Sequence, residues 1–337
     1  MVDDHLIDRM SGDVGLHLHR PVEREIVFTC DRPWEGNFSG SATFIQDDHR
    51  YRMFYRGAGW PWNPASSHLC CAESEDGIEW SRPALGLVEH DGSKENNIVM
   101  SCEVSNTFVP FKDGNPDCPP QERYKAIAKL SEPAHGLYTY ASTDGIHWRQ
   151  TSGTPVITKG YFDSQNVSFW DSVRGRYVEF HRELRGEDDA VQRGGPQLGY
   201  PGGGWARDVM TSTSPDFRRW SEPQWLQYPG TPREQLYLNQ IAPYYRAPHI
   251  LIGFPGRFMA GREIGPDLPI TSHPSFSYGG VSDTTFMSSR DGQTFDLCPE
   301  SFIRPGLRPQ DNWVYGDNFS AWGLLTTRSI FAGAPDE

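Results

Sequence analysis

Short apolar segments alternate with turn residues along the whole chain. Four segments have the two-residue period of half-buried strands or are rich in aromatic residues: Tyr51–Arg56, Tyr124–Lys129, Tyr177–Arg182 and His249–Phe254. A second short run precedes each of them, at residues 40–45, 106–111, 165–170 and 239–245. A helical period is nowhere sustained beyond about two turns. The pattern predicts an all-β protein.

A turn motif follows each of the four segments. Each copy places an aspartate four residues before an aromatic residue, and three copies read Asp-Gly; the aspartates are Asp76, Asp144, Asp216 and Asp291. They lie 68, 72 and 75 residues apart. Asp-Gly supplies the positive φ that a hairpin turn requires, and the aromatic ring packs on the next strand. These aspartates are interpreted as turn and packing elements, not as catalytic groups.

Each period of about seventy residues holds about four short strands, which is the content of one β-propeller blade. We therefore expect residues 1–337 to form a single five-bladed β-propeller of four-stranded antiparallel blades. The expected blades cover residues 35–95, 97–158, 160–228, 234–300 and 302–337, and the last is closed by an N-terminal strand near 23–29. Four blades are the alternative.

Composition supports this interpretation and excludes several classes of function. The 34 glycines and 27 prolines favour many turns, and 11 Trp, 14 Tyr and 18 Phe supply apolar area. The net charge of −13, without a basic run, argues against nucleic acid as the main ligand. No apolar stretch is long enough to span a membrane. The acidic N-terminus does not resemble a secretory signal, so we expect a cytoplasmic protein or an exported one whose signal has been removed.

Cysteine and histidine spacing predicts no bound cofactor. The six cysteines form no CxxC pair, which gives no support to a zinc finger or a thioredoxin-type motif. No His or carboxylate spacing specifies a metal, although a structural Ca²⁺ in the propeller channel stays open. The oligomeric state is also open.

In a propeller the first strand of each blade lines the channel, so the residues that lead these strands are the candidates for chemistry. They are rich in carboxylates, carboxamides, aromatic rings and arginines, the types that bind sugars. The candidate catalytic residues are Glu35, Asp163 and Glu234. The candidate substrate-binding residues are Trp34, Asn37, Asn166, Arg182, Tyr237, Asn239, Arg246, His249 and Arg257.

Each candidate also has a structural interpretation. Asp163 could cap a turn, and Glu35 could pair with an arginine at a blade edge. The arginines could converge on a channel anion or form salt bridges between neighbouring blades. His249 could be a general acid or a hydrogen-bonded strand residue.

The repeats and blade-start motifs resemble the five-bladed propeller glycosidases of the arabinanase, xylosidase, invertase and fructosidase families. Trp34-Glu35-Gly36-Asn37 is similar to the invertase motif Trp-x-Asn-Asp-Pro-Asn, with Glu35 as the nearest acid. Phe162-Asp163 is similar to the Arg-Asp-Pro or Leu-Asp-Pro motif. Arg246-Ala-Pro-His249 resembles the arabinanase motif Glu-Gly-Pro-His, with Arg246 in the place of the glutamate.

The resemblance implies a glycoside hydrolase that cleaves a terminal sugar from an oligo- or polysaccharide with a carboxylate pair. Glu35 would act as base or nucleophile, Asp163 as its partner and Glu234 as proton donor. The arginines suggest an acidic or sulfated sugar. The alternatives are a propeller glycoside phosphorylase and a non-catalytic carbohydrate-binding propeller.

Overall fold

The computed structural model describes residues 3–59, 63, 66–101, 103–185, 206–232, 234–260, 280–306, 318–329, 331, 333, 334 and 336. Regular structure in these residues is almost entirely β-strand, with short 3-10 turns such as Glu103–Asn106 and Pro120–Glu122. The predicted all-β class is therefore confirmed.

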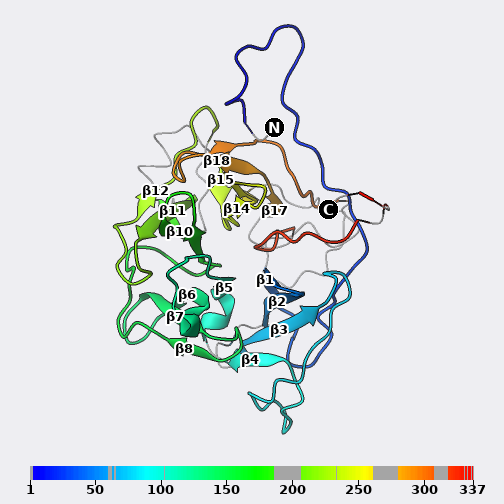
Figure 1. Ribbon diagram of the computed structural model, residues 1–337, viewed down its shortest axis with the longest axis vertical. Helices are drawn as coiled ribbons and strands as arrows, with labels where there is room; N and C mark the ends of the chain where they lie inside the picture. Colours follow the sequence, from blue (N-terminus) through cyan, green and yellow to red (C-terminus); the bar gives the residue numbers. More distant parts are fainter. Residues whose placement is uncertain are drawn as a thin grey trace. The chain divides into compact units, whose positions relative to one another are not determined.

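The strands assemble into four-stranded antiparallel sheets (Figure 1). The first sheet has the order β1-β2-β3-β4 and consists of β1 (Gly40–Asp47), β2 (Arg50–Gly57), β3 (His68–Ser74) and β4 (Ile98–Ser101). The second has the order β5-β6-β7-β8 and consists of β5 (Val109–Lys112), β6 (Tyr124–Leu130), β7 (Gly136–Ser142) and β8 (Trp148–Gln150). Each sheet follows the chain order, as hairpin connections require.

The later part of the chain repeats this arrangement. The third sheet contains β9 (Val167–Asp171), β10 (Arg176–Arg185), β11 (Ala206–Ser214) and β12 (Gln224–Trp225). The fourth contains β14 (Ala242–Tyr244), β15 (Ala247–Gly253), β18 (Met287–Ser289) and β19 (Asp296–Leu297). Another sheet, of three strands, contains β13 (Gln235–Leu236), β16 (Gly256–Ala260) and β17 (Gly280–Thr284). These are sheets of the kind that build a β-propeller, while the number of blades and their boundaries stay a prediction.

The chain divides into two compact units. The first unit comprises Met1–Glu23, Phe180–Thr211 and Gln224–Ser320. The second unit comprises Arg24–Glu179, Ser212–Pro223 and Ala321–Glu337. The boundary falls within β10 and β11.

In the second unit, the first strands of three sheets lie next to one another, because β5 neighbours both β1 and β9. The Gln165 amide fixes this arrangement from the residues before β9. Its Nε2 donates to the carbonyls of Ser41 and Ala42 (3.1 and 3.3 Å) and to the hydroxyl of Thr43 (3.1 Å). Buried apolar residues of the first two sheets, including Phe54, fill the core between them. The residues that lead these strands are thereby gathered in one place.

The four aspartate motifs form the same turn. In the second copy, Oδ1 of Asp144 accepts from the backbone N–H groups of Ile146 and His147, both at 2.8 Å. The preceding Ser142 hydroxyl donates to the same carboxylate at 3.0 Å. Gly145 has a φ of 78°, which favours glycine. The same pattern of bonds recurs at Asp76, Asp216 and Asp291. The interpretation of these aspartates as turn elements is confirmed.

The predicted N-terminal strand near residues 23–29 is wrong, because these residues form no strand. Side chains hold the segment instead of a backbone ladder. The Phe28 ring lies 5.2 Å from that of Tyr55, and the Arg82 guanidinium lies 4.1 Å from the Phe28 ring. Arg82 also donates to the carbonyl of Thr29 at 2.5 Å. The backbone is thus bound by an arginine from another part of the second unit.

The described part of the C-terminal segment adds a single parallel bridge to β1. Trp322 accepts from the N–H of Phe44 (2.8 Å) and donates to the carbonyl of Ala42 (3.0 Å). Residues 307–317 lie outside the described residues. The proposed fifth blade therefore stays a prediction.

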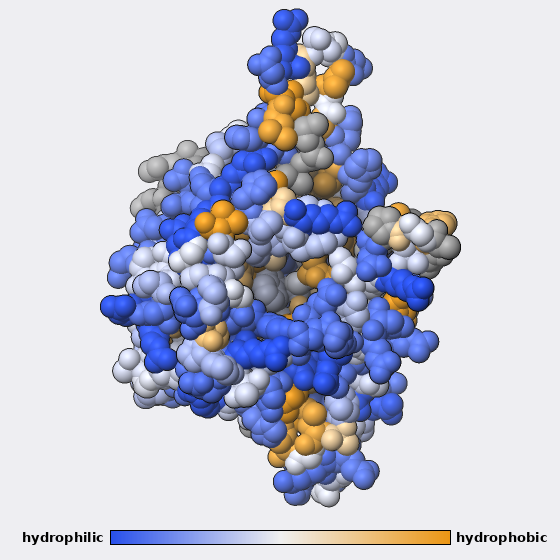
Figure 2. Space-filling view, viewed as in Figure 1, coloured by the Kyte–Doolittle hydropathy of each residue, from blue (hydrophilic) through white to orange (hydrophobic). Residues whose placement is uncertain are grey.

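The face shown in Figure 2 is mainly hydrophilic, and hydrophobic residues appear on it in separate small areas. In the part of the chain that the structure describes, no helix has the length and apolar character needed to cross a membrane.

We expect the Asp144→Ala variant to lose about 1 kcal/mol of unfolding free energy, because two backbone donors lose their acceptor at a partly hydrated turn. Urea denaturation measures this change. The control is Glu75→Ala, which removes an exposed acid that lies next to Asp76 in the first copy of the turn. Equal stability of the two variants would contradict the structural role of the turn.

Low pH should remove the contribution of these turns to the free energy of unfolding. Partial burial favours a higher pKa for Asp216, but hydrogen bonds from the N–H groups of Arg219 and Arg218 outweigh it and lower this pKa to about 2. The unfolded value is about 3.9, so the carboxylate stabilises the fold fully above that pH and ceases to do so as the pH falls to about 2. The stability difference between the wild type and Asp216→Asn should therefore shrink between about pH 4 and pH 2. A pH-independent difference in denaturation midpoint would count against this assignment.

Candidate functional site

Candidate residues gather in two clusters, one in each unit. In the second unit, Arg56, Asn106 and Asp163 form what we call the Asp163 cluster. The Asn106 amide donates to the backbone carbonyl of Asp163 at 3.0 Å, and an Arg56 Nη1–H donates to the Asn106 carbonyl oxygen. Arg56 is buried, and its guanidinium lies 4.3 Å from the Phe38 ring. Residues from β2 and from the segments that precede β5 and β9 thus meet.

The backbone holds Asp163 in one place. Phe162 has a φ of 58° although it is a bulky residue, and its side chain is fully buried. Its ring lies 5.5 Å from that of His135, and its carbonyl accepts from the buried amide of Asn166 at 3.3 Å. Such a conformation persists only where the surroundings impose it, and it is found often at functional sites. Asp163 itself is half-buried, so its carboxylate stays within reach of solvent.

Glu35 has a different environment, because it is fully buried. Its carboxylate accepts from the Tyr55 hydroxyl at 2.5 Å and from Arg82 at 2.8 and 3.1 Å. The N–H of Arg32 donates to it at 2.9 Å. Burial, with Cys70 and the bond to Glu35 adding to it, raises the pKa of Tyr55. The second interpretation of Glu35, a pair with an arginine, is the one that fits these contacts.

The residues next to Glu35 also have structural contacts or face solvent. The Trp34 indole donates to Asn97 Oδ1 at 2.8 Å. Asn37 is exposed.

In the first unit, Arg182, Arg207, Tyr237, Arg257 and Glu234 form the Tyr237 cluster. The guanidinium groups of Arg182 and Arg207 lie 4.5 and 5.6 Å from the centre of the Tyr237 ring. Both arginines are buried, and Arg207 donates to the Gln235 amide oxygen at 2.9 Å. The Tyr237 ring stacks on that of Phe319 at 5.4 Å. A fixed, half-buried aromatic ring therefore lies among arginines.

Two carboxylates share Arg257, which lies opposite Leu236, the residue before Tyr237. Arg257 binds Asp283 through two hydrogen bonds, of 3.0 and 2.8 Å, and Glu234 through one of 3.2 Å. The Asp283 side chain is fully buried, while that of Glu234 is 32% exposed. Burial opposes the shift, but Asp283 and Glu234 raise the pKa of Arg257. Of the two acids in this pair, Glu234 is the one that a substrate could contact.

Strand pairing places these residues on one sheet. β13 pairs with β16, so that Leu236 lies opposite Arg257, and the Tyr237 N–H donates to the Gly256 carbonyl at 2.7 Å. Because successive side chains of a strand point to opposite faces, Glu234 and Arg257 lie on the face of Leu236, whereas Tyr237 lies with Gln235 on the other face, where Arg182 contacts it. Asn239 is buried near them, but its amide donates to the carbonyl of Phe180 at 3.3 Å, which is a structural contact.

Arg246 and His249 do not join the Tyr237 cluster. Both are exposed, Arg246 in the turn between β14 and β15 and His249 near the start of β15. The Arg246 guanidinium lies 5.2 Å from the ring of Tyr245. Residues 245 and 246 make the turn itself, which points their side chains to solvent.

Sequence reasoning missed three residues that shape these sites: Arg82, Asn106 as a direct partner of Asp163, and Asp283. Asp283 lies in β17 among small and apolar residues. A lone acid in a buried strand signals a paired charge, because burial of an unpaired carboxylate is costly. Arg82 carried no such signal, since it follows an ordinary turn motif.

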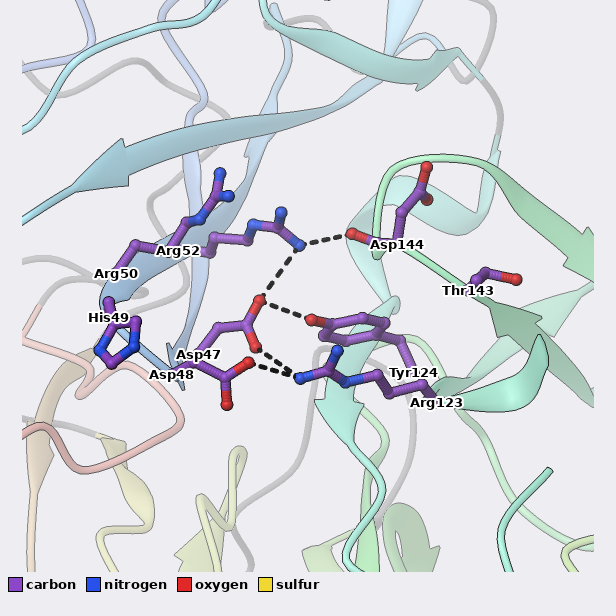
Figure 3. A pocket seen from close by; sticks show the side chains of 9 residues that line it. All are labelled: Asp47, Asp48, His49, Arg50, Arg52, Arg123, Tyr124, Thr143 and Asp144. Carbon is purple, nitrogen blue, oxygen red and sulfur yellow. Dashed lines mark hydrogen bonds and ion pairs between the residues drawn. The ribbon is translucent and has the colours of Figure 1, made fainter. Parts of the chain in front are cut away.

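A polar pocket of about 370 Å³ in the second unit has a different character (Figure 3). Its charged side chains bind one another: the Tyr124 hydroxyl donates to Asp47 at 2.5 Å, and Arg123 binds Asp48 at 2.6 Å. Arg52 donates to the Asp144 carbonyl at 2.5 Å. Lys112 and Arg123 lower the pKa of Asp48 to about 2, and burial together with Asp47 raises the pKa of Tyr124 to about 12. This network links the first and second sheets, so we interpret it as structural.

Metal ligation finds no support in the described ranges. No three His, Cys, Asp or Glu side chains there gather in a way that would hold an ion.

Comparison with known proteins shows the fold alone. No family and no curated protein matches the sequence. Among solved structures, an N-acetylgalactosamine deacetylase from F. plautii has a TM-score of 0.50 at 12% identity, over 80% of this chain and 71% of that one. A GH130 protein, from a family of mannoside phosphorylases that contains glycoside hydrolases, has a TM-score of 0.47 at 12% identity, over 86% and 78%. An α-L-arabinofuranosidase from Fusarium graminearum has 0.44 at 12%, over 79% and 67%. At this identity the similarity concerns the fold alone, and the relation to propeller glycosidases stays a resemblance.

The Glu35→Gln variant should lose about 3 kcal/mol of unfolding free energy, because it leaves Arg82 without the partner to which it is bonded in a buried pair. Chemical denaturation measures the loss. Glu79→Gln, an exposed site in the first aspartate turn, is the control. A Glu35→Gln protein as stable as the control would reopen a catalytic role for Glu35.

Proposed function

We propose that this protein is a glycoside hydrolase that releases a terminal sugar at the Tyr237 cluster. One observation carries the proposal: a solvent-accessible carboxylate, Glu234, lies on a buried arginine that a second carboxylate holds in place. An aromatic residue, Tyr237, lies three positions further along the chain. Sugar-binding sites combine aromatic and charged residues, because an aromatic ring packs against the apolar part of the sugar while charged groups bind its hydroxyls.

Each member of the cluster has a separate role in this proposal. Glu234 exchanges the proton with the glycosidic oxygen or with water, the work of one carboxylate in a glycosidase pair. Asp283 is fully buried and binds Arg257 in bidentate geometry, so it is a positioning residue. Tyr237 contacts the sugar with the edge of its ring, because Phe319 stacks on the ring and Arg182 lies over it.

Asp163 is the second candidate carboxylate. Its support comes from the second unit alone: it leads a first strand, is half-buried, and follows a residue held at positive φ. It is therefore tested separately from Glu234.

The arginines favour an acidic or sulfated sugar as substrate. Arg182, Arg207 and Arg257 all lie within the Tyr237 cluster, and guanidinium groups bind carboxylate and sulfate in bidentate geometry. This is the substrate class that we propose.

A non-catalytic carbohydrate-binding protein is the second candidate. The contacts of the acids favour it, because Glu35 is bonded to Arg82 and Glu234 to Arg257. Binding needs the aromatic ring and the arginines, but it needs no acid and base.

The test is turnover of an aryl-glycoside panel that includes uronides and sulfated sugars. Glu234→Gln and Asp163→Asn should each lower kcat/KM by about 100-fold or more, the contribution of a positioned acid or base. Glu300→Gln, an exposed acid in the same unit as Glu234, is the control and should retain activity.

The other outcomes identify the alternatives. Unchanged turnover in Glu234→Gln or in Asp163→Asn would remove that residue from the mechanism. Turnover that requires added phosphate would identify a phosphorylase. Calorimetric sugar binding by the wild type without any turnover would favour the non-catalytic candidate.

A further inference from the structure

We infer that the first unit carries a second carbohydrate-binding site, which holds a neutral glycan chain and takes no part in the reaction. It is a pocket of about 510 Å³, which we call the Trp225 pocket. The residues of its wall that carry the argument are Arg185, Gln224, Trp225, Gln227, Tyr228 and Gln293. All of them belong to the first unit.

The Trp225 pocket is separate from the Tyr237 cluster. Successive side chains of a strand point to opposite faces of the sheet. On β10, Arg182 and Arg185 are three residues apart, and on β11, Arg207 and Asp208 are adjacent. Arg182 and Arg207 contact Tyr237, whereas Arg185 binds Asp208. The same two strands therefore supply one site on each face.

Arg185 indicates that the Trp225 pocket binds a hydrogen-bond acceptor. It is only 6% exposed, its Nε donates to Asp208 at 2.5 Å, and its guanidinium lies 3.8 Å from the centre of the Trp225 ring. Its Nη2 is buried and has no hydrogen-bond partner among the residues that the structure describes. A buried donor without an acceptor is unfavourable, and a ligand oxygen would remove that cost.

The other side chains that line the Trp225 pocket indicate the class of ligand. Asp208 balances the charge of Arg185, and the other five side chains are uncharged, so the pocket does not favour an ion. Trp225 and Tyr228 offer aromatic rings, and three glutamines offer amide donors and acceptors. Aromatic rings with amides suit a neutral, polyhydroxylated ring.

The position of the pocket suits a long chain. β12, which contains Gln224 and Trp225, is an end strand of its sheet. Gln224 and Gln227 are exposed, and Trp225 is half-buried. An open pocket at a sheet edge lets a polymer extend past it in both directions.

The choice of a sugar as ligand rests on the proposed function, while the pocket itself does not. The experiment measures affinity electrophoresis of the full-length protein in gels that contain one polysaccharide each, neutral or acidic. Trp225→Ala should weaken binding to a neutral polysaccharide about tenfold, because stacking on the indole is lost. Turnover of small aryl glycosides should not change. Tyr245→Ala, an exposed aromatic site of the same unit, is the control.

A second variant, Gln224→Ala, keeps the test valid if Trp225→Ala does not fold. It removes an exposed amide of the pocket and should weaken the same binding to a smaller extent. Circular dichroism checks the fold of each variant.

The inference is overturned if the wild type binds none of the polysaccharides, if the folded pocket variants bind as the wild type does, or if binding is lost only for acidic ones. Failure of the two proposals is distinguishable. Binding that depends on Trp225 without any turnover would refute the hydrolase and leave the second site standing. Turnover together with polysaccharide binding that does not depend on Trp225 would support the hydrolase and refute the second site.

Discussion

Ion pairs between arginines and buried carboxylates hold segments next to the candidate residues of each unit. Arg82 binds the fully buried Glu35 in the second unit, and Arg257 binds the fully buried Asp283 in the first. Neither acid could be buried alone, because the cost of removing an ionised carboxylate from water is large. Each pair therefore fixes two segments that are far apart in the sequence. The residues next to these pairs, before the first strands and at the strand ends, are thereby held in position.

The need to pair buried carboxylates also divides the acids into structural ones and ones that a ligand could contact. A carboxylate whose oxygens are all bonded in the interior, such as that of Glu35, serves the fold. Glu234 and Asp163 keep contact with solvent while their neighbours hold them in position. In Asp163 the positioning comes from the backbone, through Phe162 and Asn106, rather than from an ion pair. The two residues are thus the acids that we propose for the reaction.

Much of the fold could be predicted because its signals are local. The period of Tyr51–Arg56 predicts β2, and Asp144-Gly145 predicts a turn with positive φ; the structure has both. The segment near residues 23–29 was mispredicted as the strand that closes the last blade, whereas the carbonyl of Thr29 is bound by the side chain of Arg82. Local patterns describe what a segment can form, and they do not identify which other segment satisfies its hydrogen bonds.

The sequence by itself determined the all-β class, the recurring aspartate turns and the kinds of side chain that lead the first strands, because each depends on residues within a few positions of one another. Only the tertiary structure decided that Glu35 is sealed in an ion pair, that Arg182 and Arg207 meet at Tyr237, and that Arg246 stays at an exposed turn. These outcomes depend on pairing across strands and on burial. Both are set by segments tens to hundreds of residues apart, whose contacts leave no mark on the local pattern.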